Sequence, residues 1–384
     1  MNAARICAVV CLYAFPSLAF AGVMVSSPGT GISMKSPVHF VASGSSPACS
    51  KGVAAIGIYT APYKLAYVVK GSTLDTKLSM KPGHYNVVVQ HWDKCGWTSK
   101  QAIAVHVAST TTTAVPRSKH VWIITEENHS YEKVFGNSSM QYYNSLASKY
   151  ALATQYYSDR HSSLPALMRF VAGQDVTTNN STTSCFNVDN IVRHLLLNGL
   201  TWKSYQEDLP YAGFTGRSWA NYVRRHNPLI DFTDVCAAGQ KLNSVPYGHL
   251  TTDMANNSTP NYVYITPNLQ HDGHDGTREQ ADAWLSKHVP KILALPEFQS
   301  GGDGLLFIAW DEGTLHTDDR CSASVSSGCG GRVATVVIGP NVKRNFKSQT
   351  LYHHENLLKT VCDALGFSSC PGAADTAKPM LDFF

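Results

Sequence analysis

The sequence contains no run of lysines and arginines longer than two residues, although its formal net charge is +4 over 384 residues. Nucleic-acid-binding proteins gather such residues into a basic cluster, so nucleic acid is not an expected partner. No two cysteines have the C-x-x-C spacing typical of structural zinc sites, and no internal repeat occurs. No stretch after residue 21 is long and apolar enough to span a bilayer, which excludes a later membrane span.

The first residues of the chain have the features of an export signal. Arg5 is followed by the apolar run Ile6–Phe20, which closes in Ala19-Phe20-Ala21. A basic start, a short apolar run and an A-x-A end are typical of a signal peptide, cleaved here after Ala21. An uncleaved membrane anchor is the alternative interpretation. We expect residues 1–21 to be a signal peptide and the mature protein to be secreted or periplasmic.

The cysteine count agrees with export. Eight cysteines remain after residue 21, and an even number in an oxidising compartment favours disulfides. Sequence alone leaves the connectivity open, and the simplest pairs close short loops within one segment. The expected pairs are Cys49–Cys95, Cys185–Cys236, Cys321–Cys329 and Cys362–Cys370.

Residues 22–116 alternate apolar and polar side chains in short stretches, which clusters of Gly, Pro and Ser separate. Several short strands at regular spacing predict a small β-sandwich. Its resemblance to immunoglobulin-like domains is one of architecture only. We expect the Cys49–Cys95 disulfide to staple this domain, Trp92 and Trp97 to fill its core, and a linker to lead up to Pro116.

From residue 117 onward, apolar runs without alternation are separated by helical patterns. This order predicts one α/β domain over residues 117–384, with a mostly parallel sheet covered by helices. The predicted strands are His120–Thr125, Tyr262–Thr266, Leu305–Trp310 and Val333–Ile338. The predicted helices lie near residues 139–150, 187–198, 278–289 and 355–365.

A long insertion runs from about residue 177 to residue 256 and is rich in aromatic side chains. Such side chains can grip a hydrophobic or ring-bearing leaving group, but in most proteins they belong to the core, which is the interpretation we favour. The aromatic residues are Trp202, Tyr205, Tyr211, Phe214, Trp219 and Tyr222.

Polar side chains follow the predicted strands at the points where the strands end. In sheets of this kind, ligands bind beyond the carboxyl ends of the strands. Carboxylate, amide and imidazole groups gathered there suit zinc or a hard divalent cation. The clusters are Glu126-Glu127-Asn128, Asn268 with His271-Asp272 and His274-Asp275, Asp311-Glu312, and His353-His354 at the start of the last helix.

Each cluster also has an ordinary interpretation. Glu127 and Asn128 suit the first turn of a helix, and Asn128 opens a glycosylation sequon. Turns in general are rich in such residues. Ser162 and Ser163 lie beside Pro165 and fit an ordinary helix start. They fit equally well a nucleophile whose developing anion is stabilised by backbone N–H groups. Only the coincidence of four clusters at corresponding strand ends favours a site.

The order of these motifs resembles a known family. Glu127-Asn128-His129-Ser130-Tyr131 and the stretch from Tyr156 to Pro165 look like the secreted bacterial phosphoesterases, a family of acid phosphatases and phospholipases C. That family is similar in fold to alkaline phosphatase, a three-layer α/β/α domain. The later clusters match its motifs in the same order, so the resemblance covers about His120 to Phe367 and leaves the first domain out.

The resemblance implies a role for each matching residue. Ser163 matches the nucleophile, which attacks phosphorus and carries the phosphoryl group, while Ser162 is the rival candidate. Glu126 and His129 are expected to be scaffolding. The implied metal ligands are Glu127, Asn128, Asp311 and Glu312. The implied phosphate-binding or second-metal residues are His161, Asn268, His271 and Asp272, with His274 and His354 moving protons.

Two positions depart from the family pattern. Ser162 stands where Pro is common, and Ala166 stands where an Asn would donate a hydrogen bond to phosphate. The sequence predicts a phosphomonoesterase of the acid phosphatase kind that uses one or two divalent metal ions and a phosphoserine. Two alternatives stay open, a phospholipase C acting on phospholipid headgroups and a catalytically degenerate surface binding protein. The expected partner is a phosphate ester, either a small molecule or a phospholipid.

Overall fold

The computed structural model describes residues 21–107, 114–237, 239–314, 320 and 328–384. The chain divides into two compact units between Thr111 and Thr112. The expected signal peptide lies outside the described residues, apart from Ala21. Among the helices of the described segments, none has the length and apolar character that crossing a bilayer requires.

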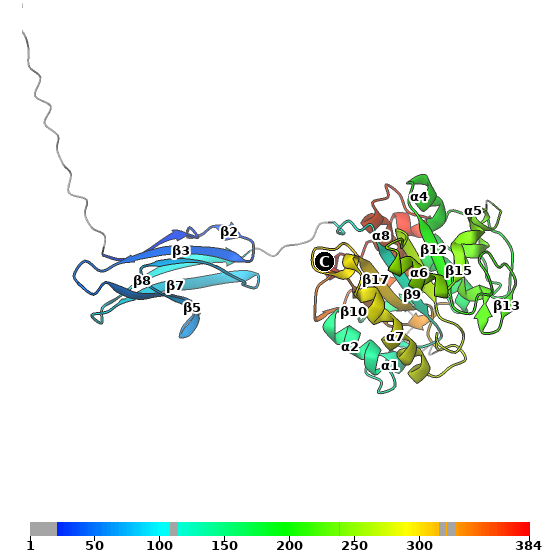
Figure 1. The fold of residues 1–384 in the computed structure, drawn as a ribbon, viewed down its shortest axis with the longest axis horizontal. Helices are drawn as coiled ribbons and strands as arrows, with labels where there is room; N and C mark the ends of the chain where they lie inside the picture. Colours follow the sequence, from blue (N-terminus) through cyan, green and yellow to red (C-terminus); the bar gives the residue numbers. More distant parts are fainter. Residues whose placement is uncertain (1–20, 108–113, 238, 315–319, 321–327) are drawn as a thin grey trace, which may run out of the picture. The chain divides into compact units, whose positions relative to one another are not determined.

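The N-terminal unit is built from strands in two sheets (Figure 1). The three-stranded sheet has the order β1-β3-β6 and the five-stranded sheet the order β2-β8-β7-β4-β5. Inward-facing aliphatic side chains such as Ile56, Val87 and Val105 form one core between the strands. The strands are β1 (Gly22–Ser27), β2 (Ser33–Met34), β3 (Val38–Ser45), β4 (Val53–Ala61), β5 (Lys64–Lys70), β6 (Thr73–Leu78), β7 (Gly83–Asp93) and β8 (Thr98–Val107).

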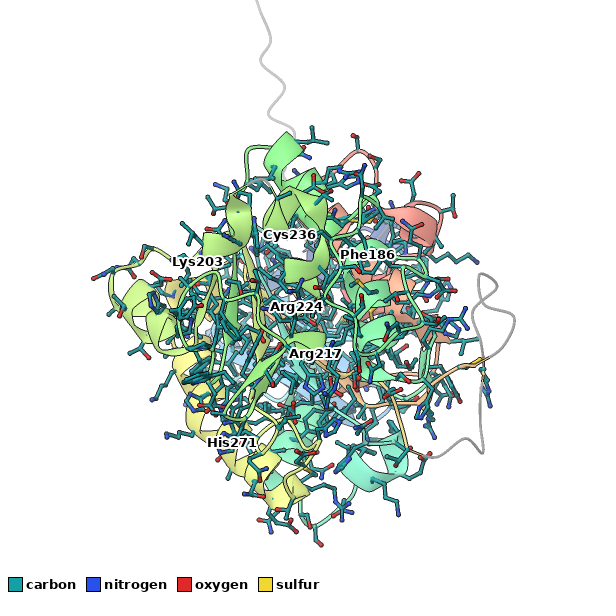
Figure 2. The ribbon with its side chains drawn as sticks, turned by 90° about the vertical axis from the view of Figure 1, so that its right-hand side faces the viewer. Phe186, Lys203, Arg217, Arg224, Cys236 and His271 are labelled. Carbon is teal, nitrogen blue, oxygen red and sulfur yellow. A yellow bond between two sulfur atoms is a disulfide. The ribbon has the colours of Figure 1, made fainter. Side chains whose placement is uncertain are left out.

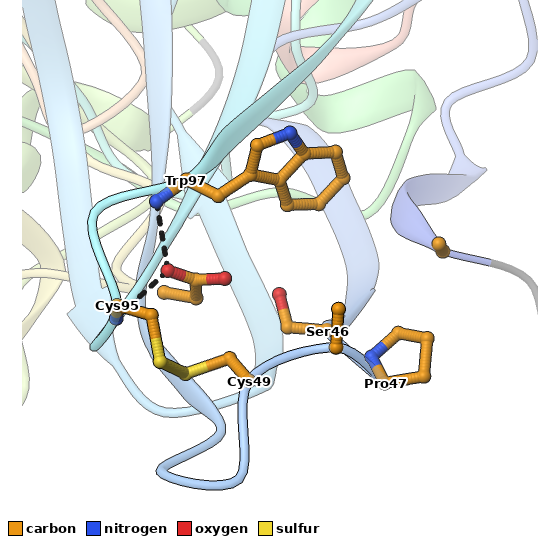
Figure 3. A pocket seen from close by; sticks show the side chains of 8 residues that line it. Ser46, Pro47, Cys49, Cys95 and Trp97 are labelled. Carbon is orange, nitrogen blue, oxygen red and sulfur yellow. Dashed lines mark hydrogen bonds between the residues drawn. A yellow bond between two sulfur atoms is a disulfide. The ribbon is translucent and has the colours of Figure 1, made fainter.

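The expectation that Trp92 and Trp97 fill this core is wrong. Trp97 is 48% exposed, and Trp92 alternates along β7 with the buried residues Val89 and His91, which places its ring on the outer face. Inward positions hold aliphatic side chains instead. The Cys49–Cys95 disulfide is present as predicted, and Asp93 supports its loop by accepting hydrogen bonds from two backbone N–H groups (Figure 3).

The C-terminal unit contains an eight-stranded sheet of order β15-β12-β16-β9-β17-β19-β10-β20. The five strands from β15 to β17 are parallel to their neighbours, whereas β19 runs antiparallel to both β17 and β10. The sheet is therefore mixed, with the predicted parallel arrangement at its centre. The strands are β9 (Val121–Glu126), β10 (Ala151–Ala153), β12 (Trp202–Gln206), β15 (Ser244–Pro246), β16 (Tyr262–Thr266), β17 (Leu305–Trp310), β19 (Thr335–Ile338) and β20 (Phe346–Ser348).

Every residue of β9, β16 and β17 is buried, so both faces of the central sheet are covered. Helices α2 and α7 pack against each other, as do α3 and α8. The runs of Val, Ile, Leu and aromatic residues form strands here because their side chains have apolar partners on both sides. The helices are α1 (Tyr131–Val134), α2 (Gln141–Lys149), α3 (Ser163–Ala172), α4 (Ile191–Leu197), α5 (Thr233–Cys236), α6 (Gly248–Ala255), α7 (Arg278–Leu293) and α8 (His354–Leu365).

Short strands and single turns complete the unit. A second sheet has the order β18-β11-β21, and a hairpin pairs β13 with β14 inside the insertion. The remaining elements are β11 (Tyr156–Ser158), β13 (Ser218–Trp219), β14 (Tyr222–Val223), β18 (Gly331–Arg332), β21 (Tyr352–His353), and the 3-10 turns η1 (Arg224–His226), η2 (Pro228–Asp231), η3 (Gln240–Asn243), η4 (Pro296–Phe298), η5 (Gly372–Asp375) and η6 (Leu381–Phe383).

Two further disulfides form as predicted, Cys185–Cys236 and Cys362–Cys370. Cys329 is also disulfide-bonded, but its expected partner Cys321 lies outside the described residues. The disulfides agree with an oxidising compartment.

The six aromatic residues of the insertion divide into buried and exposed groups, with half-buried Phe214 packed between Tyr211 and Tyr222. Trp202, Tyr205 and Tyr222 are buried, as expected for core residues. Tyr211 and Trp219 are 61% and 59% exposed, so the core interpretation is wrong for these two. Trp219 is exposed because it lies in the short strand β13, both of whose residues are exposed and which pairs, among the described strands, only with β14.

Candidate active site

The central parallel strands bring three of the predicted clusters together. β16, β9 and β17 are neighbours in the sheet, so their carboxyl ends lie at one edge. Backbone hydrogen bonds join the segments that follow. Glu127 N donates to the carbonyl of Asp272 at 2.8 Å, and Asp311 N donates to the carbonyl of Glu126 at 3.0 Å. The strand-end clusters therefore form one continuous surface, which we call the wall and which consists of Glu126-Glu127-Asn128, Asp272 and Asp311-Glu312.

Ser163 faces this wall from the first turn of α3. Its Oγ donates a hydrogen bond to Glu127 Oε2 at 2.7 Å, and the residue is only 2% exposed. Ser162 precedes the helix with a φ of 83°, a conformation that side chains with a Cβ rarely adopt. The bend turns Ser163 inward. Of the two serines, Ser163 is the one whose hydroxyl is held against a site carboxylate.

The backbone on either side of Ser163 and Glu127 is held by Asp311 and Glu312. Asn128, with a φ of 56°, donates its N–H to Asp311 Oδ1 at 3.1 Å. Ser162 donates its N–H to Glu312 Oε2, which His161 Nδ1 also approaches to 2.9 Å. Asn128 and Ser162, both with a positive φ, thus donate their backbone N–H groups to the neighbouring carboxylates of Asp311 and Glu312. Backbone strain of this kind is found mainly at functional sites.

The structure adds His226, which is not among the predicted site residues. His226 Nδ1 lies 2.9 Å from Asp272 Oδ2, and His226 Nε2 lies 3.4 Å from Glu127 Oε1. His226 comes from η1 in the insertion and is 2% exposed. No motif signals this residue in the sequence, because it reaches the wall through the fold of a segment 46 residues before Asp272.

Arg225 is a second unpredicted member. Its guanidinium Nη2 lies 3.2 Å from His274 Nε2, and His274 Nδ1 lies 2.6 Å from Asp275 Oδ1. A guanidinium always donates, so His274 Nε2 accepts here and Nδ1–H donates to Asp275. The Nε of Arg225 is buried without a hydrogen-bond partner among the described residues. Figure 2 shows the side of the C-terminal unit that carries the insertion, where Arg224, the residue before Arg225, is labelled beside Arg217.

His354 lies behind the wall and is fully buried. Its Nε2 is 2.8 Å from the carbonyl oxygen of Asp311 and its Nδ1 is 3.1 Å from the Tyr156 hydroxyl. Its ring stacks on Phe170 with centroids 3.9 Å apart. Burial lowers the pKa of His354 to about 4, so the ring is neutral at ordinary pH. These contacts hold the Asp311 backbone in place.

Two predicted site residues pair with another part of the unit. Asn268 Nδ2 donates to Asp208 Oδ2 at 2.9 Å, and His271 Nδ1 lies 2.9 Å from Glu207 Oε2. Both partners follow β12, the strand beside β16. The Asn268 carbonyl accepts a 2.8 Å hydrogen bond from the N–H of Asp272. Their side chains thus flank the wall, while their backbone shapes the turn that presents Asp272.

The wall concentrates buried negative charge. Burial raises the pKa of Asp272 to about 7 and that of Asp311 to about 7. Burial, followed by the charge of Asp311, raises the pKa of Glu312 to about 9 and that of Glu127 well above its ordinary value. Like charges in a water-poor site oppose one another's ionisation. The arrangement therefore favours either bound protons or a bound cation.

The residues present fit a divalent cation. Glu127 Oε1, Asp311 Oδ2 and His226 Nε2 are buried and have no hydrogen-bond partner among the described residues. Such orphaned atoms carry a desolvation cost of about 1–3 kcal/mol each, and more when charged. Carboxylate oxygen and neutral imidazole are the donors that zinc and harder divalent cations accept. Glu127, Asp311 and His226 thus offer unpaired donor atoms of the kinds that such an ion accepts, beside Asp272.

Comparison with known proteins shows which family the chain resembles. The sequence model of the Phosphoesterase family matches residues 137–367, a range that includes Ser163 and Asp311 but begins after Glu127. A phosphatidylinositol-3-phosphatase of Mycobacterium tuberculosis is 30% identical over 273 residues, which cover 71% of this chain and 84% of that protein. A probable acid phosphatase of Kluyveromyces lactis is 30% identical over 256 residues, covering 63% of this chain and 57% of that protein. The chain thus spans little more than half of the fungal relative.

Solved structures are more distant. A protein of the alkaline phosphatase superfamily from Vibrio parahaemolyticus shares 10% identity with a TM-score of 0.45, covering 67% of this chain and 70% of that one. The lipoteichoic acid synthase LtaP of Listeria monocytogenes shares 12% identity with a TM-score of 0.47, covering 71% and 76%.

The family match covers more than half of the chain, and the mycobacterial relative is 30% identical over 71% of it. It begins 17 residues later than the resemblance expected from the motifs and ends at the same residue, Phe367. The chain belongs to the phosphoesterase family, and the prediction of a phosphoester hydrolase is confirmed.

Proposed function

We propose that this protein is a metal-dependent phosphomonoesterase that forms a phosphoserine on Ser163. The observation that carries the proposal is the contact of Ser163 Oγ with Glu127, beside the unpaired ligand atoms of Asp311 and His226. A nucleophile, a carboxylate that orients it and a cation site thus adjoin one another. This combination suits phosphoryl transfer, which depends mainly on positioning and charge stabilisation.

Ser163 is the attacking group in this proposal. Glu127 Oε2 accepts the hydroxyl hydrogen bond and so fixes the direction of Oγ. The new bond forms between Oγ and phosphorus as the Oγ proton passes to Glu127 Oε2, while the bond from phosphorus to the leaving oxygen breaks. Water then attacks the phosphoserine, phosphate departs, and Ser163 recovers its proton. The backbone N–H of Ser163, at the start of α3, would donate to a phosphoryl oxygen.

Arg225 and His274 would act together on the phosphate and the leaving group. Arg225 now donates to His274 Nε2, and a phosphate dianion would compete for that guanidinium because a charged hydrogen bond is the stronger one. Release of His274 Nε2 would let it take up a proton and pass it to the leaving oxygen. Arg225 would also supply the donor that buried Ala166 lacks.

The metal centre would be held by Glu127, Asp311, Asp272 and His226. A divalent cation there supplies a Lewis acid that stabilises charge on a phosphoryl oxygen and lowers the pKa of a nearby hydroxyl. Asn128 and Glu312 stay predicted ligands. His354 is assigned a positioning role for Asp311 in place of the proton transfer predicted from sequence, because its ring is fully enclosed.

The proposed substrate is a phosphate monoester, either soluble or carried by a lipid. Arg225 favours a dianion, and a diester offers only one negative charge. The mycobacterial relative is named for a phosphoinositide monoester, which brings a lipid-borne substrate into the proposal. We further propose that the chain is exported by residues 1–21, that its C-terminal unit is alkaline-phosphatase-like, and that its N-terminal unit is immunoglobulin-like.

The test compares hydrolysis of a chromogenic phosphate monoester, phosphatidylinositol 3-phosphate and a chromogenic phosphocholine diester, each with and without chelator. We expect both monoesters to be cleaved, the diester to be cleaved poorly, and the chelator to abolish turnover until metal is restored. Cleavage of the diester alone would establish the phospholipase C alternative. Cleavage of none of them with any divalent metal would leave a degenerate binding protein.

A further inference from the structure

The two units of the chain differ in charge. Residues 22–107 contain eight lysines and two aspartates, with no arginine or glutamate, which gives a net charge of +6. Residues 108–384 contain 22 basic and 25 acidic residues, which gives −3. The modest charge of the whole chain therefore conceals a strongly basic N-terminal unit. A small domain of one charge sign indicates a partner of the opposite sign.

The outer side of the five-stranded sheet carries a groove of about 630 Å³. The residues on this side come from alternate positions of β4, β7 and β8, whose other positions face the core. We call the side the groove face. Its principal side chains are Tyr59, Pro62, Tyr63, Asn86, Gln90 and Lys100.

The aromatic side chains of the groove face are presented to solvent. Tyr63 is completely exposed, at 101% of its reference area, although its φ of 61° is unfavourable for a residue with a Cβ. Tyr59 lies near Trp92, with ring centroids 6.4 Å apart. Leu65 and Val68, on the neighbouring edge strand, are 45% and 50% exposed. Aromatic and aliphatic side chains are thus exposed on the groove face and beside it.

Among the described residues, the groove face carries no carboxylate. Asp93 is buried in the loop closed by Cys49–Cys95, where its carboxylate accepts two backbone hydrogen bonds (Figure 3). Asp75 belongs to β6 of the other sheet, where it pairs with His39. The cations Lys70 and Lys100 lie on the five-stranded sheet without an acidic neighbour opposite them. The face is therefore complementary to negative charge.

We propose that the groove face binds an acidic polysaccharide. Sugar rings present C–H faces that pack on aromatic rings such as Tyr59 and Tyr63. Sugar hydroxyls both donate and accept hydrogen bonds, as do the side-chain amides of Asn86 and Gln90. Carboxylates on the polymer would pair with Lys100. Lipid headgroups or duplex DNA would use the lysines but would leave the combination of tyrosines and amides unexplained.

The test is affinity electrophoresis of the full-length protein through gels containing polygalacturonate, at low ionic strength. Parallel gels contain dextran, a neutral polysaccharide. We expect retardation by polygalacturonate and none by dextran. Lys100→Gln should weaken binding about fivefold through loss of one ionic contact, and Tyr63→Ala about fivefold through loss of the stacking surface. Tyr63 is fully exposed, so its loss leaves the fold intact.

Matched controls separate this site from general charge. Lys77→Gln removes an exposed lysine from the other sheet, and Tyr211→Ala removes an exposed tyrosine from the C-terminal unit. Both should bind polygalacturonate like the parent, and hydrolysis of a small monoester should be unchanged in all four variants. The proposal fails if the parent is not retarded, or if Lys77→Gln weakens binding as much as Lys100→Gln. Equal or tighter binding to phosphatidylglycerol vesicles or duplex DNA, with the same sensitivity to Lys100→Gln, would also overturn it.

Discussion

Replacement of Ser163 by alanine tests the nucleophile directly. Ser163 Oγ is the only atom removed, and it donates one hydrogen bond of 2.7 Å to Glu127 Oε2. Loss of this bond leaves buried Glu127 Oε2 without its donor and costs about 1–3 kcal/mol, while alanine favours the helix that begins at this position. The variant should therefore fold, with a melting temperature within about 10 °C of the parent.

The effect on turnover should be far larger than the effect on stability. Without Oγ no phosphoserine forms, and removal of a catalytic nucleophile typically lowers kcat by about 10³–10⁶. At 1.36 kcal/mol for each factor of ten, this loss is about 4–8 kcal/mol of barrier. Ser162 contributes its backbone N–H to Glu312, so Ser162→Ala should keep kcat within about tenfold of the parent.

The assay pairs steady-state hydrolysis with trapping of the intermediate. Parent protein is mixed with a phosphate monoester, quenched in acid and digested, and the phosphorylated peptide is sequenced by mass spectrometry. The phosphoryl group should lie on Ser163, and Ser162→Ala should still yield the adduct. If Ser163→Ala keeps more than a tenth of the parental kcat, or if the adduct maps to Ser162, the reasoning from the Glu127 contact is refuted.

Three further predictions concern two residues of the proposed site and one histidine of α7. Asp311→Asn removes one of the crowded buried carboxylates, so without metal the variant should melt at a higher temperature than the parent. Added metal should raise its melting temperature less than that of the parent in differential scanning fluorimetry. A larger metal-induced rise in melting temperature would contradict the assigned cation site. Arg225→Gln should lower kcat/KM for a monoester about tenfold or more and change that for a diester less, and equal losses would exclude a role in recognising the dianion. His288 stacks on Trp284, and burial lowers its pKa from 6.5 to about 4. Between these two pH values the folded state therefore binds fewer protons than the unfolded state. The free energy of unfolding should accordingly fall as the pH drops from about 6.5 to about 4. His288→Phe should flatten that slope, a difference of about 2 kcal/mol at pH 4 in urea unfolding, and an unchanged slope would refute it.

Local sequence patterns were sufficient for the central elements of the fold. Tyr262–Thr266 and Leu305–Trp310 form strands with the predicted bounds, because each is an apolar run short enough to cross a sheet once. The predicted strand Val333–Ile338 begins later, at Thr335, because Val333 instead makes a single bridge with Ser130. Its antiparallel direction was not predictable, since direction depends on how the chain returns to the sheet and not on the residues of the strand.

The site was predictable where its residues follow strands and not elsewhere. Glu127 and Asp311 meet because β9 and β17 are parallel neighbours; the alternation of strands and helices predicts their parallel direction, whereas their adjacency comes from the fold. Arg225 and His226 belong to an insertion with no repeating pattern, so only the folded insertion shows where their side chains lie. The outward position of Trp92 was missed for a related reason, because aromatic content does not reveal which face of a strand is covered.

The Cys185–Cys236 disulfide has a consequence for where the enzyme can work. It encloses the segment that delivers Arg225 and His226 to the wall, so two groups of the proposed centre depend on a covalent tie that forms only under oxidation. In a reducing cytoplasm the newly made chain would lack that tie and hold these groups loosely. Under this proposal the enzyme would hydrolyse few phosphate esters in the reducing cytoplasm of the producing cell and would become fully active only in an oxidising compartment.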